Sequence, residues 1–94
     1  MAKAIFAGKT IAESDNTVIV EGNHYFPRES IKDEYFVDSD LKTVCPWKGE
    51  ASYFSVIVDG KKSEDAAWYY PRAKPDAKNI ENYVAFWRDV KIEG

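Results

Sequence analysis

The hydrophobic positions of this chain recur mainly at every second residue, as in β-strands, and not at every third or fourth residue, as in amphipathic helices. Apolar runs at residues 4–7 and 17–20 are each followed by a glycine-containing turn. The second run, Thr-Val-Ile-Val, consists of the β-branched residues that strands favour. We therefore expect short strands joined by tight turns.

The remaining elements are located by the same pattern. Strands are predicted at residues 24–26, 34–37, 41–45, 51–58, 61–70, 83–87 and 90–92. Asp38-Ser39-Asp40 is expected to be a turn between two of them. Short helical turns are predicted at residues 27–31, which begin with a proline, and at residues 76–80, where Asp76 is the expected N-cap.

Closely spaced strands indicate one mainly β domain that covers residues 1–94. A chain of 94 residues has the usual size of a single domain with a thin core. We expect an antiparallel sandwich or open barrel of about seven or eight strands, with one or two short helical turns. The alternative is an α+β domain with one true helix near residues 76–83.

The clearest predicted element is a hairpin centred on Asp59-Gly60, a dipeptide typical of two-residue turns. In that register Val58 faces Lys61, and each step back along one strand matches a step forward along the other. The further expected pairs are Tyr53 with Ala66, Ala51 with Trp68, and Gly49 with Tyr70. Because side chains alternate between the two faces, all six lie on one face. They predict a slot with a floor of small residues and walls of aromatic rings.

The opposite face of this hairpin is predicted to belong to the aliphatic core. Its residues are Phe54, Val56, Val58, Ala67 and Tyr69. At the far end of the hairpin, Pro46 lacks an N–H and marks a strand end, and Gly49 lets the backbone turn. Trp47 and Lys48 are then expected to project at the margin of the sheet, with Lys48 as an anion contact above the slot. In the alternative, Trp47 packs as a lid on the core and Lys48 is solvated.

Three other polar features are candidates for chemistry. Arg28 together with Lys48 is a candidate phosphate or carboxylate contact, and the alternative is a surface salt bridge between Arg28 and a nearby acid. Asp38 and Asp40 have the spacing of a carboxylate pair for a divalent metal, but this run is more typical of a turn. Cys45 as a nucleophile needs a base, and a lone strand cysteine is more often a small buried hydrophobe.

Composition and charge argue against several functional classes. The net charge is −3, and 13 basic residues are scattered among 16 acidic ones, so no basic stripe indicates nucleic-acid binding. One cysteine forms no internal disulfide, and one cysteine with one histidine does not supply four zinc ligands, so we expect no metal or cofactor. No segment has a signal-peptide pattern or approaches the roughly 20 apolar residues of a membrane span. We therefore expect a cytoplasmic protein without a membrane partner.

Four runs of residues, taken together and in this order, resemble one protein family. They are Val20–Pro27, Cys45–Tyr53, Ala66–Pro71 and Tyr83–Phe86. The chain resembles the family of domains of unknown function numbered 427, which is sometimes labelled nucleotidyltransferase-like. The resemblance covers nearly the whole chain and implies a small, mostly β single domain. The motif residues that fit one cleft are Tyr25, Arg28, Cys45, Trp47, Lys48, Tyr53, Trp68 and Tyr70.

These observations favour a small-molecule-binding β domain. Its slot is expected to be formed by aromatic rings, with Lys48 and Arg28 as contacts for an anionic group. Nucleotides are one candidate ligand, because rings stack on bases and cations hold phosphate. The alternatives are an enzyme that acts on nucleotides and a protein-interaction module. The sequence indicates neither the ligand nor the oligomeric state.

Overall fold

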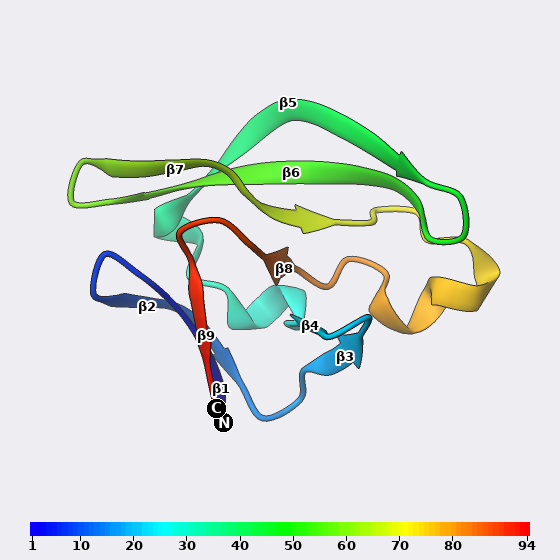
Figure 1. The fold of residues 1–94 in the computed structure, drawn as a ribbon, viewed down its shortest axis with the longest axis horizontal. Coiled ribbons are helices and arrows are strands. Elements are labelled where there is room, and N and C mark those ends of the chain that lie inside the picture. The colour runs from blue at the N-terminus through cyan, green and yellow to red at the C-terminus, as the bar shows by residue number, and fades with distance from the viewer.

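The computed structural model describes all 94 residues and contains nine strands and three short 3₁₀ helices (Figure 1). The strands are β1 (Ala2–Phe6), β2 (Lys9–Ser14), β3 (Val18–Val20), β4 (Asn23–Tyr25), β5 (Phe36–Cys45), β6 (Gly49–Val58), β7 (Lys61–Tyr69), β8 (Ala85–Phe86) and β9 (Lys91–Glu93). The helices are η1 (Arg28–Ser30), η2 (Asp33–Tyr35) and η3 (Pro75–Ile80). The prediction of a mainly β, antiparallel domain with short helical turns is confirmed, and no true α-helix is present.

The strands form three antiparallel sheets with the orders β2-β1-β9, β3-β4 and β5-β6-β7-β8. Two backbone hydrogen bonds of 2.8 Å between Phe26 and Val84 attach the β3-β4 hairpin to the edge of the four-stranded sheet next to β8. In Figure 1, β5, β6 and β7 form a long layer, with β1, β2 and β9 below one end and the β3-β4 hairpin below the other. The sheets do not close into a barrel.

Two of the predicted turns form as expected. Asp59 and Gly60 have φ angles of 50° and 79°, and Glu21 and Gly22 have φ angles of 54° and 80°. Two consecutive residues with positive φ define the tight turn whose twist matches that of paired strands. The second of these turns brings Glu21 to the outer end of the β3-β4 hairpin, where it contributes to the site described below.

The predicted register of the β6-β7 hairpin is correct near the turn and wrong beyond it. The pairs in the structure are Val58–Lys61, Val56–Ser63, Phe54–Ala67, Tyr53–Trp68 and Ser52–Tyr69. Residues 64–66 lie opposite Ser55 alone, so β7 carries two more residues than a regular ladder. The predicted pairs of Ala51 with Trp68, Tyr53 with Ala66 and Gly49 with Tyr70 are therefore wrong by two residues.

A shift of two residues leaves each side chain on its original face of the ribbon, because side chains alternate with a period of two. Ala51, Tyr53, Trp68 and Tyr70 therefore still share one face and pack in one cluster. The predicted core face is also confirmed, since Phe54, Val56 and Val58 pack with Ala67 and Tyr69 in another cluster. Ala66 is the exception, because it lies in the bulge and packs with Phe54, Val56 and Val58.

Three smaller predictions are also wrong. Asp38-Ser39-Asp40 is no turn but part of β5, where residues 40 and 41 form a bulge between the pairs Ser39–Tyr53 and Lys42–Ser52. The short helix η3 has Lys74 and not Asp76 at its N-cap, and no side chain caps it. Residues 33–35 form the 3₁₀ helix η2, so only Phe36 and Val37 of the predicted segment 34–37 are extended.

The interior consists of two hydrophobic clusters. The first lies between the β2-β1-β9 sheet and the left-hand end of the long layer in Figure 1, and its fully buried members include Ile11, Phe26 and Val56. The second lies between the other end of that layer, the β3-β4 hairpin and η3, and includes Tyr25 and Ile80. None of the helices has the length and apolar character needed to cross a bilayer.

Candidate functional site

The β5-β6 turn, made of Pro46, Trp47 and Lys48, is held against the segment that leads into η3. The backbone N–H of Lys74 donates to the carbonyl of Lys48 at 3.0 Å, and the Lys74 ammonium donates to the carbonyl of Pro46 at 2.6 Å. Gly49 follows with a φ of 118°, and a Cβ there would lie 3.1 Å from the carbonyl oxygen of Arg72. The glycine is therefore needed both for its backbone angle and for this close approach.

Lys48 is a charged residue in a buried position, since only 6% of it is exposed. Its ammonium lies 5.1 Å from the centre of the Trp47 ring and 5.8 Å from that of Tyr70. The same ammonium donates to the carboxylate of Glu21, which reaches it from the β3-β4 turn. A buried ammonium is unfavourable unless it is paired, so Glu21 and the two rings together stabilise the charge.

The pKa shifts of Glu21 and Lys48 favour the charged form of each residue. The hydrogen bond from Lys48, followed by its positive charge, lowers the pKa of Glu21, and the indole of Trp47 adds a smaller lowering. Burial alone would lower the pKa of Lys48, but the hydrogen bond to Glu21 and the nearby Tyr25, Glu21 and Cys45 raise it overall. Lys48 and Glu21 therefore form an ion pair at neutral pH.

The predicted aromatic slot is closed in this structure. Tyr25 from β4 is fully buried in the second cluster, and its hydroxyl accepts a hydrogen bond of 3.3 Å from the indole N–H of Trp68. Tyr53 and Tyr70 are 8% and 5% exposed in the same cluster. The Tyr53 hydroxyl is hydrogen-bonded to the hydroxyl of Thr43 at 3.0 Å. These rings therefore pack against one another and leave no open slot between them.

Most of the predicted site residues nevertheless meet in one region. Those in or next to the second cluster and the β5-β6 turn are Tyr25, Cys45, Trp47, Lys48, Tyr53, Trp68 and Tyr70. Arg28 lies elsewhere, where its guanidinium pairs with Asp33 at 2.8 Å and lies 5.7 Å from the centre of the Phe54 ring. Phe54 and Tyr53 point to opposite faces of β6, so the structure does not bring Arg28 to Lys48.

Sequence reasoning missed Glu21, which is the partner of Lys48. The glutamate lies in a predicted turn, and 27 positions separate it from the lysine. Nothing in the sequence pairs the two, because the contact depends on how the β3-β4 hairpin is attached beside β8. Only the attachment through Phe26 and Val84 brings the two turns together.

The open space of this region lies on the outer side of the β5-β6 turn. A hollow of about 420 Å³ is lined by Pro46, Trp47, Lys74, Pro75 and Asp76. The indole of Trp47 is 40% exposed and forms its aromatic wall. Lys48 does not line the hollow, but its ammonium lies over the Trp47 ring, which adjoins both the hollow and the ion pair. A smaller hollow of about 190 Å³ lies next to Glu50, Pro71 and Arg72 and has no ring other than the proline.

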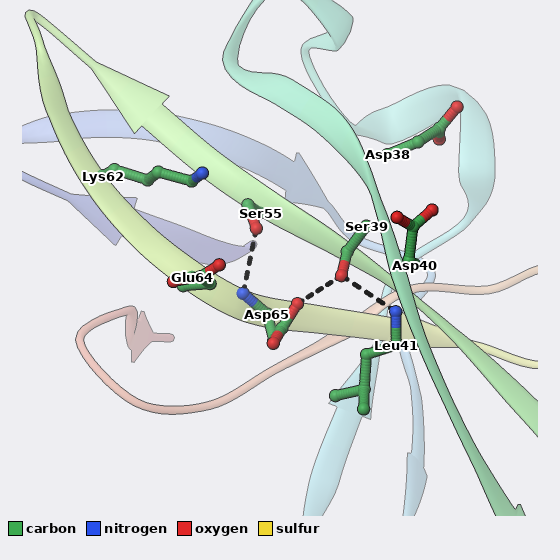
Figure 2. Close-up of a pocket in the computed structure, with 8 residues that line it drawn as sticks. All are labelled: Asp38, Ser39, Asp40, Leu41, Ser55, Lys62, Glu64 and Asp65. Atoms are coloured by element: carbon green, nitrogen blue, oxygen red, sulfur yellow. Dashed lines mark hydrogen bonds between the residues drawn. The ribbon is translucent and has the colours of Figure 1, made fainter.

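The largest hollow, of about 530 Å³, has a different character. Figure 2 shows it over the bulges of β5 and β7, lined mainly by acidic and hydroxyl side chains. Ser39 donates to the Asp65 carboxylate, and the N–H of Asp65 donates to the hydroxyl of Ser55 at 3.0 Å. Asp38 points away from Asp65 in this view, and no three acidic, histidine or cysteine side chains are grouped to hold a metal ion. The polar groups here hold the bulges together.

Comparison with models of protein families gives a match over residues 1–94 to the one described as "Domain of unknown function (DUF427)". The resemblance indicated by the four sequence motifs is thereby confirmed. No curated protein matches the chain. The matched range includes the β5-β6 turn, Glu21 and the hollow beside Trp47, and its description names no activity. The function therefore has to be argued from the geometry of the site.

Proposed function

This chain belongs to the DUF427 family, and we propose that it binds a small anionic molecule at the β5-β6 turn, as a cytoplasmic protein. The observation that supports this most is the hollow of about 420 Å³ beside Trp47. It combines an exposed indole, two rigid proline walls and the ammonium of Lys74, and a second ammonium lies behind the indole. A mostly apolar wall with a few placed charges is the usual composition of a ligand site.

Lys74 is the direct contact for a negative charge in this hollow. Its ammonium has three N–H donors, and its interaction with the carbonyl of Pro46 uses one of them. Lys74 lines the hollow, so a ligand there competes with water for the donors that are left. Asp76 lines the same hollow and offers an acceptor to a ligand that also carries an N–H donor. A nucleotide has this combination of ring, N–H donors and phosphate.

Trp47 is the surface on which a ligand ring stacks. The ammonium of Lys48 lies 5.1 Å from the ring centre and is attracted by the π-electrons of the indole. A second cation on the same ring would be repelled by Lys48, so a quaternary ammonium ligand is disfavoured. An electron-rich or anionic planar ring gains from the same charge, which favours an aromatic anion.

The test is a two-dimensional ¹⁵N–¹H NMR titration with nucleoside monophosphates and aromatic carboxylates. We expect at least one compound to shift the indole signal of Trp47 and not that of Trp87. Trp47→Ala should weaken binding about tenfold or more, which corresponds to about 1.4 kcal/mol. Trp87→Ala is the matched control, since the two residues are 40% and 43% exposed. Equal binding by Trp47→Ala and the wild type would disprove the proposal.

An enzyme that acts on nucleotides is the second candidate. It is favoured by the ion pair of Lys48 and Glu21, because a buried charged side chain with a shifted pKa is a candidate for an active site. The thiol of Cys45 lies close enough to contribute to the pKa of Lys48. Incubation with nucleoside triphosphates and analysis of the products tests this candidate, and Cys45→Ser should then abolish turnover if the thiol is the nucleophile.

A further inference from the structure

The ion pair of Lys48 and Glu21 is strongly asymmetric. The Lys48 side chain is 8% exposed, whereas the Glu21 side chain is 54% exposed. Glu21 also lies at the tip of a two-residue turn, with a positive φ of 54°. The carboxylate is therefore already partly hydrated, whereas the ammonium is confined between the rings of Trp47 and Tyr70.

When the carboxylate of Glu21 leaves, Lys48 becomes a buried charge without a partner. Such a charge is strongly destabilising, and the loss is recovered only when another anion takes its place. The ammonium has three donors, and all of them become available to the incoming group. The position that Glu21 occupies is thus an anion site that a side chain of the protein already fills.

We propose that Glu21 holds the place of the ligand's anionic group on Lys48, and that a phosphate monoester displaces it. This inference rests on the proposed function. The exchange breaks one ion pair and forms another, and no covalent bond changes. Glu21 would then weaken the binding of every anion at this turn by the same factor, so that only anions with a strong attraction to Lys48 are retained.

Glu21 is an effective competitor because it is tethered to the protein. A tethered group competes as if it were present at a millimolar concentration or above. A free carboxylate carries the same charge as Glu21, so its attraction to Lys48 is no stronger than that of Glu21. A phosphate monoester carries about 1.5 to 2 negative charges at neutral pH and has three acceptor oxygens, so its attraction to Lys48 is stronger. The geometry therefore favours phosphorylated ligands over carboxylic acids.

The Trp47 ring adjoins both the hollow and the ammonium of Lys48. Glu21 is close enough to the indole of Trp47 for that group to contribute to the lowered pKa of the carboxyl. A ring stacked on the hollow side of the indole lies about 3.5 Å from the indole plane. A ligand at this turn therefore has the Trp47 ring as a neighbour in common with the Glu21 carboxylate.

The experiment compares phenyl phosphate with benzoate, two probes with the same ring and different charge. Both are titrated by NMR into the wild type, Glu21→Gln and Glu50→Gln at constant ionic strength and neutral pH. Glu50 is an exposed acid close to Lys48 in the chain with no ion pair to it, so its variant controls for net charge. In the wild type we expect phenyl phosphate to bind about tenfold or more tightly than benzoate.

In Glu21→Gln both probes should bind more tightly by a similar factor of about threefold or more, because a tethered competitor lowers both apparent affinities equally, whereas Glu50→Gln should bind both probes as the wild type does. Unchanged affinities of both probes in Glu21→Gln, with binding still lost in Trp47→Ala, would overturn the displacement of Glu21 and leave the proposed function standing. Failure of both probes to bind any variant would overturn both.

A second measurement does not depend on the fold of the variant. In the wild type, saturation with phenyl phosphate should shift the ¹³C signal of the Glu21 carboxyl carbon, because that group leaves Lys48 for water. The carboxyl carbon of Glu50 should not shift. Binding of phenyl phosphate without any change at Glu21 would show that the ligand does not use this position.

Discussion

Tyr70 shows what burial does to a single ionisable side chain next to the site. Only 5% of the residue is exposed, and the pKa of its hydroxyl is raised well above 10.0, first because burial disfavours the phenolate and then because of Tyr25, Cys45, Tyr53 and Glu21 nearby. The pKa of Lys48, in contact with the Tyr70 ring, is also raised. A group whose pKa is raised by folding stabilises the protein below its unfolded pKa, and this contribution is lost as pH rises toward the folded pKa.

Alkaline unfolding tests this reasoning for Tyr70. The free energy of unfolding should decrease as pH rises from about 9 to about 11.5, because the tyrosine ionises in the unfolded chain before it does so in the fold. Tyr70→Phe has no group to ionise, so its decrease should be less steep. Urea denaturation at several pH values measures both, and Tyr35→Phe, in the first cluster, is the control. Equal slopes for Tyr70→Phe and the wild type would contradict the assignment.

At the scale of elements, the two bulges determine how the long layer curves over both clusters. The bulge in β7 is centred on Asp65, whose φ is 55°. Its N–H donates to Ser55, its carboxylate accepts from Ser39, and its carbonyl accepts from the indole of Trp87 at 2.6 Å. Three neighbouring segments thus hold one residue in a backbone conformation that asparagine and aspartate tolerate and β-branched residues do not.

Two substitutions at Asp65 separate the backbone angle from the side-chain contacts. Asp65→Asn keeps an acceptor and tolerates positive φ, so the free energy of unfolding should change by less than about 0.5 kcal/mol. Asp65→Val should lower it by about 1–3 kcal/mol because a β-branched residue is strained at this angle. Urea denaturation measures the loss, and Glu64→Val, an exposed neighbour on the same strand, is the control. If both valine variants lose equal stability, residue 65 does not determine the bulge.

The bulges also explain which parts of the fold the sequence could predict. Asp59-Gly60 has a distinctive turn composition and formed the predicted hairpin, because two residues with positive φ suffice to specify it. Asp65 has no such local signal, since its conformation depends on Ser39, Ser55 and Trp87 from other segments. Asp38-Ser39-Asp40 has the composition of a turn and forms part of a bulged strand, because turns and bulges favour the same residue types.

The face of the strand on which each side chain lies was more predictable than its partner residue on the neighbouring strand. Alternation assigned Tyr53 and Phe54 to opposite faces, and this survived an error of two residues in the register. The slot was not predictable in the same way. Tyr25 fills it from a separate hairpin, and Glu21, from the turn of that hairpin, pairs with Lys48. Both contacts depend on the attachment of β4 to Val84, which no local pattern encodes.

At the scale of the whole molecule, β6 connects the two clusters and the site. Ala51 and Tyr53 belong to the second cluster, whereas Phe54, Val56 and Val58 belong to the first. The turn at the start of β6 carries Trp47 and Lys48. Each cluster thus contains one end of β6. Loss of packing in one cluster therefore also removes support from the other. We expect the protein to unfold as one cooperative unit.

A matched pair of core substitutions tests this cooperativity. Ile11 lies in the first cluster and Ile80 in the second, and both are fully buried. Each isoleucine-to-alanine change removes the same three carbon atoms and should lower the free energy of unfolding by about 2–5 kcal/mol, a large part of the about 5–15 kcal/mol of a small domain. Unfolding is followed by tryptophan fluorescence and by far-UV circular dichroism. Within each protein, wild type or variant, the two probes should give the same midpoint. If Ile80→Ala lowers the fluorescence midpoint alone, the cluster that supports the site unfolds independently, and ligand binding should then stabilise only that part of the molecule.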